Sequence, residues 1–84
     1  MKGIVMNEIL INVLEDMGFF VLDQEQDFDI RDYISDSIQF MDFIVRIEEK
    51  LQIELSDDFL DYELLLSSVA LANKIESYKD SLEQ

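Results

Sequence analysis

The chain contains no cysteine, no histidine, no proline and no tryptophan, and it has only two glycines among its 84 residues. Without cysteine it cannot form a disulfide, a thiolate nucleophile or a cysteine-based zinc site. Without histidine it also lacks the commonest acid–base group and metal ligand. These absences exclude the most widespread kinds of catalytic site and metal site, so we expect the chain not to be an enzyme.

Positive charge is scarce as well. The chain has 6 Lys and Arg residues against 20 Asp and Glu residues, which gives a formal net charge of −14. Such a surface repels nucleic acid and anionic membranes, and it attracts partners with basic patches in a salt-dependent way. Composition alone is equally compatible with acidity that serves only to keep the protein in solution.

Long hydrophobic runs are missing too. No stretch reaches the length of a transmembrane helix, and the apolar run within residues 1–6 is too short for a signal peptide. We therefore expect no membrane insertion and a cytoplasmic location. A chain of this length and 49% hydrophobic content predicts one compact domain, residues 1–84, with a radius of gyration of roughly 12 Å. We expect a monomer.

The apolar residues recur with helical periodicity, which predicts an all-α fold. The first helix is expected from about Val5 to Met17, with Gly18 as its stop. A long connection, Phe19–Ser35, follows; its apolar residues argue against disorder, and it has room for a short strand or helical turn. The core-facing residues of the first helix are Met6, Ile9, Leu10, Val13, Leu14 and Met17.

The second helix is expected to begin at Asp36 or Ser37, where a side-chain oxygen can cap free backbone N–H groups, and to end at about Leu51. It carries two apolar stripes. One stripe predicts a core face made of Phe40, Phe43, Ile44, Ile47 and Leu51. The other lies on the opposite side, among Asp42, Glu48 and Glu49, and consists of Ile38, Met41 and Val45. The second stripe is a docking surface, a face that another part of the bundle covers, or a set of exposed aliphatic side chains without any function.

The rest of the chain predicts two further helices. A connector, residues 52–55, places its apolar side chains in the core, and Ser56 caps a brief third helix that ends near Tyr62. New start signals at Ser67 and Ser68 predict a fourth helix that ends at about Ser77 or Leu82. The predicted buried face of this helix is Leu71, Ala72, Ile75 and Tyr78.

Ser37 has two interpretations. As a residue at the start of a helix, it could do no more than cap a backbone N–H group. It is not a hydrolytic nucleophile, because the chain has no histidine to accept its proton and no Gly-x-Ser-x-Gly motif around it. A helix N-terminus does tolerate a phosphate group on a serine oxygen, because the helix dipole and the free N–H groups stabilise negative charge.

Three segments together resemble the acyl and peptidyl carrier proteins. They are Asp36-Ser37-Ile38, Glu48-Glu49-Lys50-Leu51 and Gln52-Ile53-Glu54-Leu55-Ser56-Asp57-Asp58. The likeness is colinear over about half the chain, and the length, the acidity and the long first connection agree with it. It implies a four-helix bundle of the acyl carrier type, with three main helices and a short third one.

The resemblance implies that Ser37 receives a 4′-phosphopantetheine arm from coenzyme A through a separate, magnesium-dependent phosphopantetheinyl transferase. The arm ends in a thiol that holds an acyl, aminoacyl or peptidyl group as a thioester, so the reactive sulfur belongs to the cofactor. The enzymes that load and transfer this cargo would dock on the second helix through basic patches. The matching recognition positions are Asp36, Ile38, Met41, Asp42, Val45, Glu48 and Glu49.

Several positions depart from the pattern of fatty-acid carriers. Ile34 stands where that pattern has glycine, Gln39 replaces an acidic residue, and Phe40 replaces a smaller one. Arg46 and Lys50 add positive charge to the second helix. These departures favour a discrete carrier in a specialised pathway, such as polyketide, nonribosomal peptide or D-alanyl transfer.

Two other classes of function stay open at the level of sequence. One is a small acidic interaction module that uses the stripe of Ile38, Met41 and Val45 without any modification. The other is a calcium site in the first connection, where Asp23, Glu25 and Asp27 alternate like loop ligands. Phe28 stands where such a loop needs glycine, and Ile34 stands where it needs the final glutamate.

Overall fold

The computed structural model describes residues 2–22 and 27–82, and these residues form an all-helical domain, as predicted. The α-helices are α1 (Lys2–Asp16), α2 (Ser37–Leu51) and α3 (Ser68–Leu82). Three 3₁₀ turns lie between them: η1 (Ile30–Asp32), η2 (Asp57–Phe59) and η3 (Tyr62–Leu66). No strand occurs in the two described ranges. The radius of gyration is 11.8 Å, close to the predicted value.

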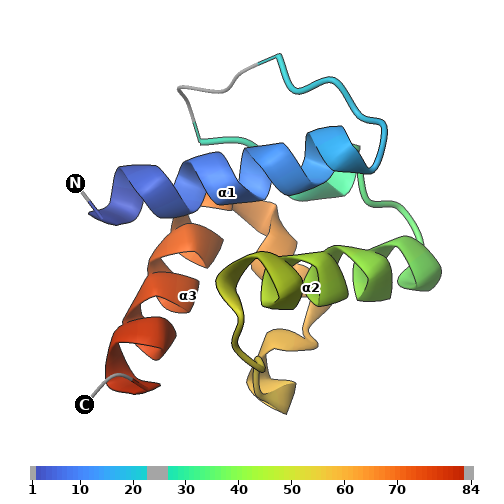
Figure 1. Ribbon diagram of the computed structural model, residues 1–84. Helices are drawn as coiled ribbons and strands as arrows, with labels where there is room; N and C mark the ends of the chain where they lie inside the picture. The colour runs from blue at the N-terminus through green and yellow to red at the C-terminus, as the bar shows by residue number, and fades with distance from the viewer. Residues whose placement is uncertain (1, 23–26, 83–84) are drawn as a thin grey trace.

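Helix α1 packs against both α2 and α3, and the turns between α2 and α3 fill one side of the bundle (Figure 1). The predicted core face of α2 is confirmed, with Leu51 half-buried at its end. In α1 the predicted stripe is buried or half-buried, but Ile11 is buried as well, because α1 is covered on more than one side. In α3, Leu71, Ala72 and Ile75 are buried and Tyr78 packs against the core.

Helix α1 ends where the glycine predicts. Gly18 adopts a left-handed conformation with φ of 98°, which is easy only for a residue without Cβ. The Gly18 N–H donates to the Glu15 carbonyl at 3.0 Å, and the Phe19 N–H donates to the Leu14 carbonyl at 3.0 Å. This pattern is the Schellman motif, which satisfies carbonyls that the helix leaves without partners.

The long connection packs against the bundle through part of its length. Val21, Ile30 and Ile34 are buried, and the ring of Tyr33 contacts the rings of Phe19 and Phe28. The predicted helical turn is η1. Phe20 and Leu22, two further apolar residues of the connection, are both 74% exposed. Some apolar side chains of the connection therefore pack against the bundle, and others are exposed to solvent.

Asp27 fastens this connection to the start of α3. Its carboxylate accepts hydrogen bonds from the Ser67 hydroxyl at 2.7 Å and from the Val69 N–H at 3.1 Å. The neighbouring backbones are joined as well, because the Ser68 N–H donates to the Phe28 carbonyl at 2.8 Å. The pKa of Asp27 is lowered, first by the hydroxyl of Ser67 and then by the backbone N–H of Val69.

The predicted brief third helix corresponds to the 3₁₀ turn η2, and a separate 3₁₀ turn, η3, follows where that helix was expected to end. Ser56 occupies the N-cap position of η2, but its side chain makes no capping hydrogen bond. Asp61 starts η3 instead, by accepting a hydrogen bond from the Glu63 N–H at 3.0 Å. A second cap within so few residues competes with a continuous helix.

The connector after α2 begins with a left-handed residue, Gln52, with φ of 58°. The Glu48 side chain then reaches forward and accepts a hydrogen bond from the Leu55 N–H at 2.7 Å. Leu55 packs against the core, as predicted. Ile53 does not, since it is half-buried and lines a surface groove.

Candidate attachment site and docking face

The first turn of α2 is capped by Asp36. Its Oδ1 accepts a hydrogen bond from the Gln39 N–H at 2.7 Å, and its carbonyl accepts one from the Phe40 N–H at 3.0 Å. The sequence predicts either Asp36 or Ser37 as the N-cap of this helix, and the structure shows that the cap is Asp36. The residue before the serine does the capping, so the serine hydroxyl is not needed for it.

The Gln39 side chain is turned back toward the residues before the helix. Its Oε1 accepts hydrogen bonds from the Ser35 N–H at 2.9 Å and from the Ser35 hydroxyl at 3.2 Å. Ser35 and Asp36 are thus both engaged locally. Within the described part of the chain, the Ser37 hydroxyl makes no side-chain hydrogen bond, and the residue is exposed.

This arrangement fits a phosphate ester on the Ser37 oxygen. The hydroxyl lies at the first position of a helix, where the dipole and the N–H groups favour negative charge. Because Ser37 is exposed, the added group can extend into solvent. The geometry provides an exposed hydroxyl, and the chain has no histidine to accept its proton.

The second apolar stripe of α2 faces solvent. Ile38 is 82% exposed, Met41 47% and Val45 44%. Their spacing places them along the side of α2 opposite the core, beginning at the residue after Ser37. The interpretation in which another part of the bundle covers this stripe is therefore wrong for the isolated chain. We call Ile38, Met41 and Val45 the α2 ridge.

Some carboxylates beside the α2 ridge accept hydrogen bonds from neighbouring groups, and others do not. Asp42 accepts from the Arg46 Nε at 3.1 Å with both oxygens, and Glu48 is held by the Leu55 N–H. Glu49 and Glu54 are exposed and line a groove at the end of α2 together with Val45, Glu48, Gln52 and Ile53. The predicted recognition residues thus lie on α2, except Asp36, which is its N-cap. Among their carboxylates, only that of Glu49 has no hydrogen-bond partner in the described residues.

Comparison with known proteins identifies the chain. A family model described as a phosphopantetheine attachment site matches residues 21–73, which is more than half of the sequence and includes all of α2. The chain belongs to the phosphopantetheine-binding carrier proteins. Proteins of this family carry covalently attached 4′-phosphopantetheine, interact with phosphopantetheinyl transferases and biosynthetic enzymes, and are generally not catalytic themselves. No curated protein and no solved structure matches the chain.

Sequence reasoning missed Tyr62 in this carrier. Its hydroxyl donates to the carbonyl of Ile34 at 2.7 Å, and its ring meets the ring of Phe40 edge-on with centroids 5.9 Å apart. These contacts join η3 to the residues on either side of Ser37. No local pattern could have shown them, because Tyr62 and Ile34 are 28 residues apart in the chain.

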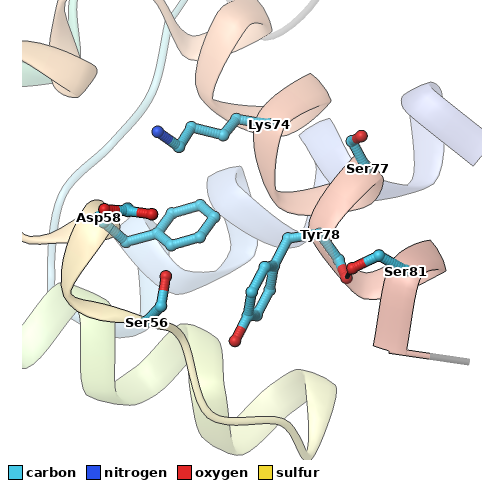
Figure 2. A pocket seen from close by; sticks show the side chains of 7 residues that line it. Ser56, Asp58, Lys74, Ser77, Tyr78 and Ser81 are labelled. Carbon is cyan, nitrogen blue, oxygen red and sulfur yellow. Dashed lines mark hydrogen bonds between the residues drawn. The ribbon is translucent and has the colours of Figure 1, made fainter.

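A second pocket of the carrier lies between η2 and α3 (Figure 2). The Lys74 amine lies 5.2 Å from the centre of the Phe59 ring, and the Tyr78 ring packs against Phe59 with centroids 5.2 Å apart. The remaining lining residues are Ser56, Asp58, Ser77 and Ser81. The Lys74 amine is thus engaged with the Phe59 ring, and we assign this pocket no function.

The calcium interpretation lacks support in the described residues. Asp27 uses its carboxylate on Ser67 and Val69, whereas Asp23 and Glu25 lie outside the described residues. Residues 2–22 and 27–82 contain no group of three potential metal ligands. Within the same ranges, no helix has both the length and the hydropathy that a membrane crossing requires.

Proposed function

We propose that Ser37 is the attachment residue of the 4′-phosphopantetheine arm, and that the carrier presents acyl or aminoacyl thioesters on this arm to partner enzymes. The observation that carries the proposal is the division of roles between neighbours: Asp36 caps α2, and the Ser37 hydroxyl is exposed and unengaged. The family match, which includes this residue, supports it.

The loading step needs little from the carrier itself. The Ser37 oxygen forms a phosphoester bond to the pantetheine-bearing phosphorus of coenzyme A, and the pyrophosphate bond breaks so that 3′,5′-ADP leaves with the bridging oxygen. The hydroxyl proton passes to a base on the transferase. The carrier contributes an accessible oxygen and a helix N-terminus that stabilises the resulting phosphate charge.

The α2 ridge and its carboxylates are the proposed docking face, made of Asp36, Ile38, Met41, Asp42, Val45, Glu48 and Glu49. Exposed apolar side chains beside carboxylates, of which Glu49 is exposed and unengaged, suit a partner with a basic rim around an apolar centre. Met41→Arg should raise the KM for loading by a phosphopantetheinyl transferase and leave the melting temperature unchanged. Glu49→Lys is the better charge variant than Glu48→Lys, because Glu48 also holds the Leu55 N–H.

The pathway is proposed to be a specialised one, such as polyketide, nonribosomal peptide or D-alanyl transfer. The support comes from the neighbourhood of Ser37. Arg46 engages Asp42 and so reduces the negative charge of α2, while the large ring of Phe40 lies one turn after the serine. The monomeric state, the extent of the domain over residues 1–84 and the cytoplasmic location stay predictions.

The decisive experiment is intact-protein mass spectrometry before and after incubation with coenzyme A, magnesium and a promiscuous phosphopantetheinyl transferase. We expect a single phosphopantetheine increment on the wild-type carrier and on Ser35→Ala, a matched variant that lacks the other exposed serine near the start of α2. Ser37→Ala should stay unmodified. An increment on Ser37→Ala would place the attachment elsewhere.

The alternative function is an unmodified acidic interaction module, and the exposed α2 ridge is the observation that favours it. Under this alternative, Ser37→Ala binds its partner as the wild type does, and Met41→Arg does not. Failure of several transferases to modify the folded wild-type chain would support the module and contradict the carrier proposal.

A further inference from the structure

The three residues before Ser37, residues 34–36, lead into α2, and we call them the attachment loop. Ile34, the first of them, is fully buried. Its N–H donates to the Ile30 carbonyl at 2.9 Å, and its carbonyl accepts from the Tyr62 hydroxyl at 2.7 Å. Both backbone groups of Ile34 are therefore hydrogen-bonded, as buried backbone groups almost always are.

The Tyr62 hydroxyl is the group that reaches the attachment loop from a distant part of the chain. Within the described ranges, no backbone N–H donates to the Ile34 carbonyl. The hydrogen bonds of Ser35 and Asp36, by contrast, are made with Gln39, which belongs to the first turn of α2. Tyr62 therefore joins the attachment loop to η3, across 28 residues of sequence.

Tyr62 is itself held on a second side. Its ring meets the ring of Phe40 edge-on, with an interplanar angle of 86°, and Phe40 is only 7% exposed. The turn η3, which begins at Tyr62, contains the fully buried Leu65 and packs against η1. The hydroxyl therefore donates from a supported position, so it can restrain the backbone that accepts its hydrogen bond.

The position of the Ser37 oxygen depends on this restraint. The start of a helix frays unless it is held, because its first N–H groups have no partners within the helix. Ser37 is the first residue of α2, between the attachment loop on one side and the buried Phe40 on the other. Tyr62 contacts both neighbours, through its hydroxyl and through its ring.

We propose that Tyr62 is a positioning residue for loading, which holds the Ser37 oxygen through the Ile34 carbonyl. The inference rests on the proposed attachment of the arm to Ser37. The restraint acts while this oxygen bonds to the phosphorus of coenzyme A, its proton passes to the base of the transferase and 3′,5′-ADP leaves. Phe40 lies on the core face of α2, opposite the α2 ridge, so loss of the Tyr62 hydroxyl should slow the chemical step without weakening docking.

The test is Tyr62→Phe, which keeps the ring on Phe40 and removes only the hydroxyl. Mass spectrometry follows single-turnover loading from coenzyme A and magnesium by an excess of a promiscuous phosphopantetheinyl transferase. The maximal rate should fall by about threefold to a hundredfold, since a misplacement of about 1 Å costs roughly a hundredfold. The dissociation constant of the carrier–transferase complex, measured without coenzyme A, should stay at the wild-type value.

The matched control is Ile75→Val, which trims a fully buried side chain on α3. It should lower the melting temperature, because it removes a buried methyl group, and it should load at the wild-type rate. This control separates the position of Ser37 from the general stability of the fold.

Four outcomes would overturn the inference. An unchanged rate in Tyr62→Phe would do so and leave the attachment to Ser37 intact. A weaker complex with an unchanged maximal rate would make Tyr62 a contact of the transferase instead. An equal fall in rate in Ile75→Val would assign the effect to stability. If the folded wild type is not loaded at all, the proposed function fails and this inference fails with it.

Discussion

Asp36 and Ser37 are neighbours that differ in whether their side-chain oxygens are hydrogen-bonded. The Asp36 carboxylate is fixed by the Gln39 N–H, and the Ser37 hydroxyl is left without a partner among the described residues. At a helix start either residue type is a good cap, so the choice is set by which one precedes the first helical residue. The aspartate of the motif therefore has a structural role that does not depend on any partner.

This role can be separated from the charge of Asp36. Asp36→Ala should lower the free energy of unfolding by about 0.5 to 2 kcal/mol, the usual cost of losing an N-cap. Asp36→Asn keeps a capping oxygen and should retain most of the stability. Urea unfolding measures both, with Asp57→Ala as a control at an exposed carboxylate in η2, outside α2. Equal loss in the Ala and Asn variants would contradict the capping role.

Asp27 is the second residue whose carboxylate stabilises the fold. Its pKa lies below the ordinary 3.8 because Ser67 and the backbone N–H of Val69 donate to the ionised form. A depressed pKa means that the stabilisation is present above the unfolded-state pKa and is lost as the pH falls through the folded-state pKa.

Asp27→Ala should therefore destabilise the carrier at neutral pH, and its difference from the wild type should shrink when the pH is lowered below 3.8. Chemical unfolding at a series of pH values measures this. Ser67→Ala, which removes the largest cause of the shift, should raise the pKa of Asp27 in an NMR titration. A difference in stability that does not change with pH would rule out this contribution.

At the scale of the element, α2 has two faces with different costs of substitution. Phe43 and Ile47 are fully buried, whereas Val45 on the α2 ridge is 44% exposed. Phe43→Ala should cost about 3 to 5 kcal/mol and Ile47→Ala about 2 to 5 kcal/mol, through lost burial and the cavity left behind. Val45→Ala is the matched control and should cost far less.

Thermal or urea unfolding measures these losses. In so small a domain the total stability is itself only several kcal/mol, so either core variant could be unfolded at room temperature. Circular dichroism at low temperature would then show the loss of helix directly. Unchanged stability of both core variants would mean that the rotation of α2 is wrong.

The elements differ in how far local patterns predict them. The bounds and both faces of α2 follow from spacings of three and four residues, and Gly18 marks the end of α1. The turn η3 was not predicted as a separate element, because Asp61 introduces a second cap after the one short helix that was expected. The contacts of Asp27 with Ser67 and of Tyr62 with Ile34 span 40 and 28 residues, and no local periodicity reports on such distances.

For the whole molecule, the formal charge of −14 acts in two opposite ways. Ion pairs such as Lys50 with Asp16, at 3.0 Å, and Arg31 with Asp29, at 2.8 Å, neutralise it only locally. The remaining carboxylates repel one another, which destabilises the folded state, and they attract basic partners, which speeds association.

Added salt should therefore move two measurements in opposite directions. The melting temperature should rise from low to physiological ionic strength as self-repulsion is screened, and kcat/KM for loading by a transferase with a basic docking patch should fall. Differential scanning fluorimetry and a loading assay in the same sodium chloride series test this. A melting temperature that falls with salt would contradict the idea that self-repulsion limits stability.

The direction of α2 has a consequence for how the carrier can be handled. The beginning of α1 and the end of α3 lie on one side of the bundle, and the N-terminal end of α2 lies on the other (Figure 1). A protein fused to either end, or a surface that holds the chain by either end, would leave the Ser37 side facing outward. Tethered carriers of this kind could therefore be loaded and unloaded in place, with partner enzymes flowing past them.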